Sequence, residues 1–434
     1  MKKVLMIVHL FHSSPRITGL AKYLPEFGWE PLILTIPKGE NPDAQTNATV
    51  IKVPYHDTLQ DISILLKNLF WKRFFGIKPN QSIGRHIEKQ FGLTSKQSFV
   101  DSFYNLYTAI IYYPDSVRSW RNYAVKAGSE IIEKNDIHAI ISSSSPVTCH
   151  LVAKDLKEKY NVPWVADLRD LWTQNHNYNY GVLRKIVEQR LEIKTLSDSD
   201  ILVTVSPDWT KKLKMLHKKE LVYTITNGFD PDTLMRKESP LTSKFTITYT
   251  GQIYPEHQDP SKLFNALRDL ISKRTINQDD VEIRFYGSES RLLLEDITKY
   301  NLSSIVKIYN KVPREVSFQK QRESQILLHL TWEGIEKAGY ATKLFEYLAA
   351  QRPILATGLG NDLTQDLIDE TNSGIYCSTV EDIKNALKEF YSEYKCKGKL
   401  TYQGELEKIN KYSYRETTKK YVEILDNLAN KKRY

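Results

Sequence analysis

The sequence is poor in the residues that build metal clusters and disulfide frameworks. Its 434 residues include only three cysteines, which stand far apart at Cys149, Cys377 and Cys396. They form neither a zinc-ligand spacing nor a disulfide pattern. We therefore expect three free thiols in a reducing cytoplasm, no metal site and no cofactor.

Long apolar runs are missing as well. No stretch of about 18 apolar residues occurs, so the sequence predicts no membrane-spanning helix. Residues 1–9 begin with charge and continue with an apolar run that is too short for a signal peptide and has no small-residue cleavage site. We interpret this run as a first buried strand.

The charge balance favours an acidic partner. The chain carries 61 basic against 52 acidic residues, a formal net charge of +9, which suits a nucleotide-sugar, anionic lipid headgroups or nucleic acid. The basic residues are scattered, and neither zinc-finger spacing nor an RNA-recognition signature occurs. Nucleic acid is therefore the weakest of the three, and we expect none to bind.

The chain is too long for one ordinary core, so two domains are expected. Short apolar runs without period-2 alternation, typical of strands buried on both faces of a parallel sheet, alternate with helical stretches. This alternation predicts two doubly wound α/β domains, whose ligands bind beyond the carboxyl ends of the strands. The predicted strands are 3–9, 30–35, 49–53, 139–143, 163–167, 201–205, 245–250, 281–286, 306–309, 326–330 and 353–356.

The most informative stretch runs from Gly339 to Ala356. It reads as a glycine-containing loop, a helix and a strand entered through Pro353. The N-terminus of a helix suits phosphate, and Lys343 adds a positive charge in its first turn. Glu346 follows on the same face, where it can accept hydrogen bonds from sugar hydroxyls. The alternative is an ordinary surface Lys–Glu pair.

These residues resemble the donor-site segment of the glycosyltransferase family 4 enzymes, whose fold is the two-domain GT-B type. The resemblance extends over nearly the whole chain. It implies that Lys343 holds the diphosphate of a nucleotide-sugar and that Glu346 binds the ribose, beside Gly339 and Tyr340 in the donor site. One position departs from the family, because an earlier glutamate near the donor sugar is replaced here by Ala338.

The first strand–loop–helix unit of the second domain resembles the same family. Its strand ends at Gly251, and the resemblance implies that an arginine after this glycine and a lysine at the following helix contact the diphosphate. The lysine is Lys262, but the arginine position is Gln252. Half of this clamp is therefore missing.

Three charged residues end a buried strand of the first domain. Asp167, Arg169 and Asp170 stand where charges are costly unless they lie in a cleft or pair with one another. Relatives have a similar Asp-hydrophobic-Arg-Asp-x-Trp segment facing the cleft between domains, which implies a catalytic role. The structural alternative is an Asp–Arg pair at a domain edge.

Two polar loops of the first domain precede helices, one at residues 9–16 and the other at 142–146. The resemblance implies that Ser14, Arg16 and Ser145 contact the acceptor. The alternatives are a plain strand–helix connection for the first loop and helix capping for the second.

The domain boundary is expected near residues 227–230. This Asn-Gly-Phe-Asp segment, with the preceding Ser-Pro, resembles the pair that closes the N-terminal domain in these transferases. We expect an acceptor-binding domain over 1–228, a donor-binding domain over 229–411, and a C-terminal helix within 412–434 that packs on the first domain.

Residues 57–125 depart from the family pattern and are expected to form an insertion. Within it, residues 64–78 mix aromatic residues with four cations, a composition that fits a helix on an anionic membrane surface. The alternative is an insertion packed on its own domain. Farther along, the Pro114-Asp115…Trp120 segment resembles that of relatives that build surface polysaccharides.

The sequence thus indicates a cytoplasmic, membrane-peripheral glycosyltransferase. It would move a sugar from a nucleotide-diphosphate donor to a lipid-linked saccharide in surface polysaccharide biosynthesis, as in lipopolysaccharide O-antigen or capsule. The resemblance implies retention of anomeric configuration and no required metal. Two other functions remain open: a non-hydrolysing nucleotide-sugar epimerase, and a non-catalytic nucleotide-sugar-binding subunit or scaffold.

Overall fold

The structure, a computed structural model, divides the chain into two compact units. Unit 1 comprises Met1–Thr224 and Val422–Tyr434, and unit 2 comprises Ile225–Tyr421. The described residues are 1–37, 48–56, 112–176, 178, 180–219, 221–233, 239–255, 257–288, 290–333, 339–360 and 362–431.

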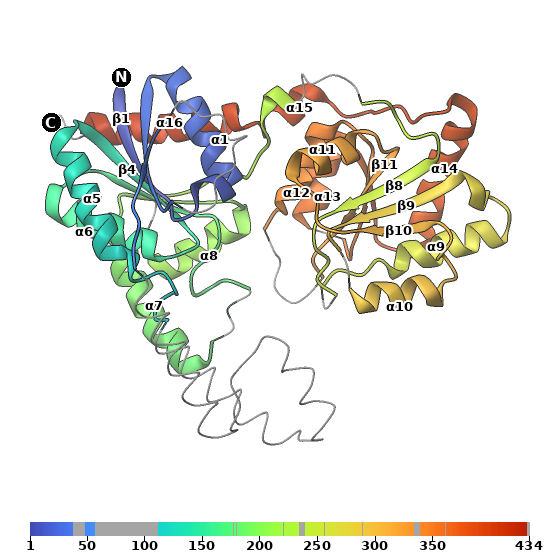
Figure 1. The fold of residues 1–434 in the computed structure, drawn as a ribbon, viewed down its shortest axis with the longest axis horizontal. Coiled ribbons are helices and arrows are strands. Elements are labelled where there is room, and N and C mark those ends of the chain that lie inside the picture. Colours follow the sequence, from blue (N-terminus) through green and yellow to red (C-terminus); the bar gives the residue numbers. More distant parts are fainter. Residues whose placement is uncertain are drawn as a thin grey trace. The chain divides into compact units, whose positions relative to one another are not determined.

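Unit 1 is built on a parallel sheet with the strand order β3-β2-β1-β4-β5-β6-β7 and helices on both faces (Figure 1). Its described strands are β1 (Lys2–Ile7), β2 (Trp29–Thr35), β3 (Thr49–Lys52), β4 (Ile137–Ser144), β5 (Trp164–Leu168), β6 (Ile201–Thr204) and β7 (Val222–Thr224). Its described α-helices are α1 (Pro15–Tyr23), α5 (Trp120–Lys134), α6 (Thr148–Tyr160), α7 (Val182–Leu196) and α8 (Pro207–His217).

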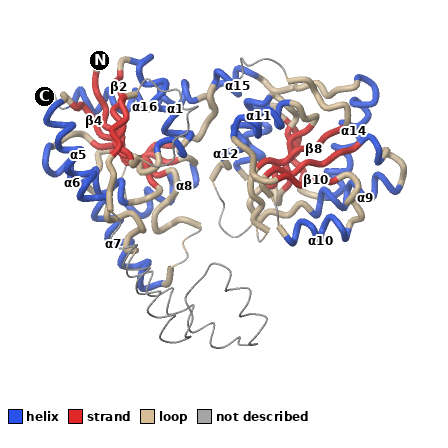
Figure 2. The backbone as a smooth tube through the Cα atoms, viewed as in Figure 1, coloured by secondary structure: helices blue, strands red, loops and turns tan. Residues whose placement is uncertain are grey.

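Unit 2 repeats this architecture with the strand order β10-β9-β8-β11-β12-β13, again parallel throughout (Figure 2). The strands are β8 (Phe245–Thr250), β9 (Val281–Tyr286), β10 (Val306–Tyr309), β11 (Ile326–Leu330), β12 (Ile354–Thr357) and β13 (Gly374–Cys377). The α-helices are α9 (Ser261–Ser272), α10 (Arg291–Lys299), α11 (Arg314–Arg322), α12 (Thr342–Ala350), α13 (Leu363–Thr371), α14 (Val380–Lys397) and α15 (Leu406–Asn410).

Both sheets reverse their strand order at one point, which locates the expected ligand sites. In unit 1 the order turns between β1 and β4, and in unit 2 it turns between β8 and β11. In open doubly wound sheets, ligands bind in the crevice beyond the carboxyl ends of the strands at this switch point. The residues that follow these four strands are therefore the first to consider.

The expected α/β class with two doubly wound domains is confirmed, and β8 to β11 have the predicted bounds. Two edge strands, β7 and β13, were not predicted. β7 is only three residues long, and β13 begins with Gly374, a weak strand former. That glycine is required because a Cβ there would lie 2.0 Å from the carbonyl oxygen of Ile354 on the neighbouring strand.

Near the two ends of unit 2, the segment by which the chain enters the unit and the segment by which it leaves lie side by side. The Phe229 amide donates to the carbonyl of Tyr412 at 3.2 Å, and the Tyr414 amide donates to the carbonyl of Phe229 at 2.8 Å. Gly228 allows this approach, because a Cβ there would lie 2.3 Å from the Tyr412 oxygen. Unit 1 is interrupted after Thr224, which is four residues before the domain boundary expected from the sequence.

The last helix, α16 (Tyr414–Lys431), begins in unit 2 and ends in unit 1. In unit 1 its Asp426 accepts hydrogen bonds from the Lys2 ammonium at 2.7 Å and the Trp29 indole at 3.1 Å. The expected return of the C-terminal helix to the first domain is therefore present in the structure.

The expected insertion over 57–125 overlaps the core of unit 1. Helix α5 begins at Trp120, whose side chain is fully buried in the core of that unit. Residues 120–125 therefore belong to the domain and not to an insertion. Residues 57–111, which include the expected membrane helix, lie outside the described residues.

Candidate functional site

Helix α12 begins at the switch-point edge of unit 2. Its apolar residues pack into the unit, and it ends at Gln351 in a left-handed conformation before the proline that leads into β12. Tyr347 fixes the helix to β8, because its hydroxyl accepts from the Thr250 amide at 3.1 Å. No side chain caps the first turn. The Leu344 amide donates to the carbonyl of Ala341 at 3.0 Å. The amide groups of the two helix residues before Leu344 therefore remain for an anion.

Lys343 lies in this first turn and reaches the end of β8. Its ammonium donates to the Tyr249 hydroxyl at 2.5 Å and lies 3.9 Å from the centroid of that ring. The Tyr249 hydroxyl in turn donates to the carbonyl of Gln252 at 3.0 Å. Within the described part of the chain, no carboxylate forms an ion pair with Lys343.

Gly251 provides the space that Lys343 occupies. A Cβ at this glycine would lie 3.1 Å from the Lys343 nitrogen, and its φ of +102° is unfavourable for residues with a side chain. The predicted donor residues Gly251 and Lys343 are thus brought into contact across two elements. By contrast, the exposed Gln252 contributes its backbone carbonyl to this arrangement.

The electrostatic environment of Lys343 disfavours its positive charge. Burial lowers the pKa of Lys343 to about 7, and Glu346 offsets only part of this effect. Burial, together with Lys343, also lowers the pKa of His329 on β11 to about 3. The site therefore holds a cation whose charge an incoming anion would stabilise.

Glu346 has a partner that the sequence did not indicate. Arg314, the first residue of α11, donates to its carboxylate at 3.1 Å through Nε and at 3.0 Å through Nη2. About half of the Arg314 side chain is exposed, against 18% for Glu346. A carboxylate accepts several hydrogen bonds, so this pair still leaves acceptor capacity for a sugar hydroxyl.

Lys262 differs from Lys343 because its charge is neutralised. Its ammonium contacts the Glu333 carboxylate at 3.0 Å and the carbonyl of Gly358 at 3.3 Å. Glu333 follows β11, beside an aromatic stack in which the rings of His257 and Trp332 lie 4.1 Å apart. Lys262 therefore lies at the switch point, where its first role is to pair with Glu333.

The remaining predicted donor residues are less informative. Tyr340 packs its ring against Phe345 of α12, with centroids 5.6 Å apart. Gly339 precedes it at the start of the described segment. The departure from the family pattern at Ala338 lies outside the described residues.

In unit 1, the switch point gathers several predicted residues around a buried ion pair. Arg16, near the start of α1, contacts Asp167 of β5 at 3.1 Å through Nη2 and at 3.2 Å through Nε. Ser143 donates to the other carboxylate oxygen at 2.8 Å. Asp167 is fully buried and Arg16 is 5% exposed. Asp167 can thus position Arg16 but does not itself reach solvent.

Arg169 holds the two predicted acceptor loops together. It donates to the Ser14 hydroxyl at 2.8 Å and to the carbonyls of Ser144 at 2.9 Å and Ser145 at 3.0 Å. Ser14 is buried, whereas Ser145 is exposed. An Asp–Arg pair, the structural alternative considered above, does form, but Asp167 pairs with Arg16. Arg169 instead connects the two loops.

Asp170 is the most accessible acid of this cluster. Its side chain is exposed, yet the protein around it displaces enough water to raise the pKa of its carboxyl, an effect that Arg169 and His176 counteract. Among the three predicted catalytic residues, Asp170 is therefore the most exposed.

No role was predicted from the sequence for Tyr249 in unit 2 or Ser143 in unit 1. Arg314 was expected near the nucleotide base and Glu333 near the donor sugar but out of register, whereas their pairing with predicted donor residues was not foreseen. Each follows or ends a strand or begins a helix on the carboxyl side of the sheet, so its position was a usable signal. The partner of each residue could not be predicted, because these contacts join residues that are far apart in the sequence. In the described ranges, no three His, Cys, Asp or Glu side chains come together as a metal site.

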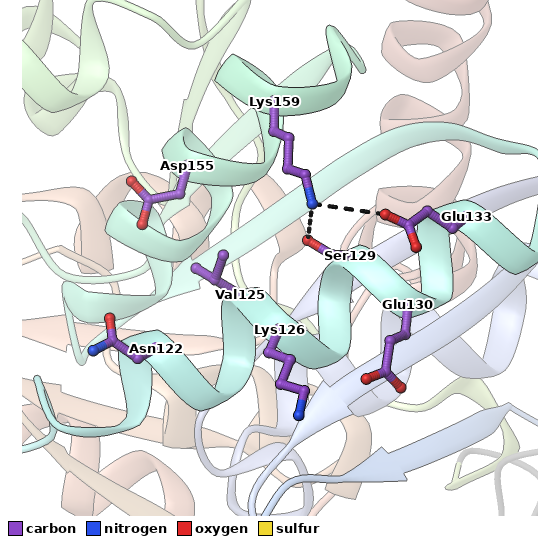
Figure 3. Close-up of a pocket in the computed structure, with 8 residues that line it drawn as sticks. All are labelled: Asn122, Val125, Lys126, Ser129, Glu130, Glu133, Asp155 and Lys159. Carbon is purple, nitrogen blue, oxygen red and sulfur yellow. Dashed lines mark hydrogen bonds and ion pairs between the residues drawn. The ribbon is translucent and has the colours of Figure 1, made fainter.

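A separate groove of about 440 Å³ lies between α5 and α6 of unit 1 (Figure 3). Its charges are partly paired with each other: Lys159 contacts Glu133 at 3.6 Å and Ser129 at 3.4 Å. The lining residues belong to these two helices and not to the carboxyl edge of the sheet. We therefore do not assign the groove to the site.

Comparisons with known proteins identify the fold but no sequence family. No protein-family model and no curated sequence matches the chain. The structure is similar to a solved glycosyltransferase from Rickettsia africae, with 15% identity, 98% of each chain covered and a TM-score of 0.56. It is also similar to HepE from Anabaena, solved with UDP and glucose, with 12% identity, 98% of this chain and 100% of that chain covered, and a TM-score of 0.62.

A third similar structure is the lipopolysaccharide outer core galactosyltransferase WaaB, with 12% identity, both chains fully covered and a TM-score of 0.56. These likenesses establish the GT-B fold, with its two doubly wound domains.

Proposed function

We propose that the protein is a glycosyltransferase that uses a nucleotide-diphosphate sugar as its donor. The observation that carries this proposal is Lys343, a half-buried lysine at the start of α12 with no carboxylate partner among the described residues. An anion bound by the first turn of α12 would restore the charge that burial disfavours. The GT-B fold and a structural neighbour solved with UDP and glucose support the choice of a nucleotide-sugar.

In the proposed reaction, the bond between the anomeric carbon and the β-phosphate oxygen breaks as an acceptor hydroxyl forms a new glycosidic bond. Negative charge then grows on the departing nucleoside diphosphate. Lys343 and the amides of α12 are arranged to stabilise that charge, which lowers the barrier to departure. With this cationic support we propose a metal-independent transfer. The resemblance to the family 4 enzymes is the reason that we propose retention of configuration.

Glu346 and Arg314 are proposed to position the nucleoside. The Glu346 carboxylate accepts from the ribose hydroxyls, and Arg314 holds its orientation. Glu333 and Lys262 flank the sugar side of the switch point. In unit 1, the loops braced by Arg169 would receive the acceptor, with Asp170 as its candidate acid or base.

The acceptor is proposed to be a lipid-linked saccharide of surface polysaccharide biosynthesis, at the cytoplasmic face of a membrane. The net charge of +9 supports work at an anionic surface. No helix of the described residues is both long and apolar enough to cross a bilayer.

A thermal-shift panel tests the donor site. Purified protein is heated with UDP-, GDP-, dTDP-, ADP- and CMP-sugars, alongside the variant Glu346→Ala and the control Glu389→Ala on the exposed side of α14. We expect one nucleotide class to stabilise the wild type and the control but not Glu346→Ala. Stabilisation by none of the five would contradict a donor site.

Incubating the protein with the nucleotide-sugar that the panel identifies, without an acceptor, and analysing the products separates the other two functions. An epimerase would interconvert the stabilising nucleotide-sugar without any acceptor, and a non-catalytic subunit would bind it without turnover. The absence of an arginine at Gln252 is the feature that a non-catalytic subunit would share.

A further inference from the structure

The solvent-facing side of helix α7 in unit 1 is unusually apolar. The helix runs at the edge of the described part of unit 1 (Figure 1). Five of its aliphatic side chains are between 39% and 82% exposed: Val182, Leu183, Ile186, Val187 and Ile193. A surface helix normally turns such residues to the core. So many on one helix therefore indicate a surface that something covers.

The charges of α7 are distributed just as unusually. Lys185, Arg190 and Lys194 are exposed, and none of them forms an ion pair with a described carboxylate. The two acids, Glu188 and Glu192, are buried and bonded inside unit 1. The exposed face thus combines apolar and cationic side chains and excludes acids.

We propose that this face of α7 is a docking surface for an anionic lipid bilayer. Apolar side chains of such a face enter the boundary between headgroups and acyl chains, and cations pair with anionic headgroups. This inference rests on the proposed function, since it gives a transferase with a lipid-linked acceptor its contact with the membrane.

A second candidate to cover this face of α7 is the segment 57–111 of the same chain. The charges of the face favour the bilayer over that segment. Arg184 of α7 donates to the carbonyls of Tyr112 at 3.2 Å and Pro114 at 3.1 Å, so this segment rejoins the described protein beside α7. It carries more basic than acidic residues. A cationic segment does not complement a cationic face, whereas an anionic bilayer complements both.

Helix α10 of unit 2 provides a matched contrast. Its Leu292 and Leu294 are about half exposed, as on α7. However, the acids Glu295 and Asp296 follow directly. Apolar exposure accompanied by acids is not expected to favour an anionic bilayer, so α10 supplies the control.

The test is co-sedimentation of the full-length protein with vesicles of phosphatidylglycerol and phosphatidylcholine. One variant removes apolar contacts (Leu183→Ser with Val187→Ser), a second reverses charge on the same face (Arg190→Glu with Lys194→Glu), and the control is Leu292→Ser with Leu294→Ser. Because the first variant removes apolar contacts with the bilayer and the second removes attraction to anionic headgroups, we expect roughly a tenfold or larger loss of vesicle binding for both α7 variants. We expect no loss for the control and no binding to pure phosphatidylcholine vesicles.

Stability, oligomeric state and nucleotide-sugar binding are measured on the same variants. Unchanged vesicle binding would overturn the inference. A lower melting temperature for both α7 variants would show that the chain itself covers this face, and a change in oligomeric state would identify a second copy. Either result also overturns the inference, but leaves the proposed donor site intact if nucleotide-sugar binding persists.

Discussion

Lys343 and Gly251 form the most specific pair of residues in unit 2. The lysine is held over Tyr249, and a Cβ at position 251 would crowd its ammonium nitrogen at 3.1 Å. Burial lowers its pKa to about 7. The protein thus bears the cost of a poorly solvated cation, which is a common property of sites that bind anions.

Replacing Lys343 should stabilise the unliganded protein while removing diphosphate binding. Because the folded pKa is depressed, the penalty is fully present below about pH 7 and is relieved as the pH rises toward the value of the unfolded chain. We expect Lys343→Met to raise the melting temperature by about 2–4 °C at pH 6 and by less at pH 9. Scanning calorimetry at both pH values measures this difference.

The matched control is Lys388→Met on the exposed side of α14, which should behave like the wild type at both pH values. Lys343→Met should also weaken binding of a nucleoside diphosphate far more than binding of the nucleoside. Equal losses for the two ligands would refute a phosphate role.

Gly251→Ala should impair the donor site through both strain and crowding. A positive φ costs a residue with a side chain roughly 1–3 kcal/mol, and the added methyl group would push the Lys343 ammonium from its place. Gly398→Ala is the control, because it has a positive φ of +72° with nothing within 4 Å of its Cβ. Denaturant unfolding should show a similar destabilisation for both variants, whereas only Gly251→Ala should lose nucleotide-sugar binding. Loss of binding in both would trace the effect to stability alone.

The sequence was informative about single residues that lie in one segment. Lys343 and Glu346 are three residues apart, so a helix brings them to one side. The pairing of Tyr249 and Arg314 with them could not be found in this way, because these two residues lie 94 and 32 residues from their partners. Their contacts depend on how β8, α11 and α12 pack.

At the scale of elements, short contacts fix the helices and loops around each switch point. Tyr347 ties α12 to β8, and Gln321 of α11 donates to the Thr250 hydroxyl at 3.0 Å. In unit 1, Arg169 performs the equivalent task for two loops. These contacts set the positions of the residues that would meet the substrates.

Arg169→Lys should loosen the acceptor loops and leave the donor site unchanged. A lysine keeps the charge but lacks the planar fork that reaches three acceptors at once. We expect transfer to fall at least roughly tenfold with no change in nucleotide-sugar affinity, measured with the donor that the thermal panel identifies. Arg121→Lys serves as control, since it alters an exposed pair with Asp155 on the helical face of unit 1. Full activity in Arg169→Lys would show that the contacts of Arg169 with the two loops are not needed for transfer.

Elements were predicted where their sequence pattern was long and uniform. The strands β8, β9 and β11 are short runs that are almost completely buried, which is the pattern expected of central parallel strands. The edge strand β10 is only partly buried, and its bounds were predicted from its β-branched and aromatic residues. The edge strand β13 begins with Gly374, which weakens its strand pattern. The glycine is needed because the backbone of β12 lies too close for a side chain, and this contact is not visible in the sequence. Trp120 likewise belongs to a core helix, which became clear only from its burial.

At the scale of the molecule, the chain forms two units with separate cores, and it passes from one unit to the other after Thr224 and after Tyr421. The C-terminal helix completes unit 1 after the chain has built unit 2. Its Leu425 is fully buried there. The stability of the first unit therefore depends on the last residues of the sequence.

Leu425→Ala should destabilise unit 1 selectively. Truncating a buried leucine costs about 2–5 kcal/mol, whereas the exposed Leu406→Ala should cost little. Hydrogen exchange followed by mass spectrometry should show faster exchange in β1 and β2 but not in β8 or β9. Uniformly faster exchange in both units would mean that they do not unfold independently.

The most direct test of the central claim is a proton count during donor binding. Calorimetry of an intact nucleotide-sugar at pH 8, in buffers of different ionisation enthalpy, measures the protons taken up by the complex. Since Lys343 is mostly neutral there and should be charged once it holds the diphosphate, we predict uptake of about one proton by the wild type. Lys343→Met should take up none. Binding without proton uptake in the wild type, or with the same uptake in the variant, would contradict the assignment of Lys343 to the diphosphate.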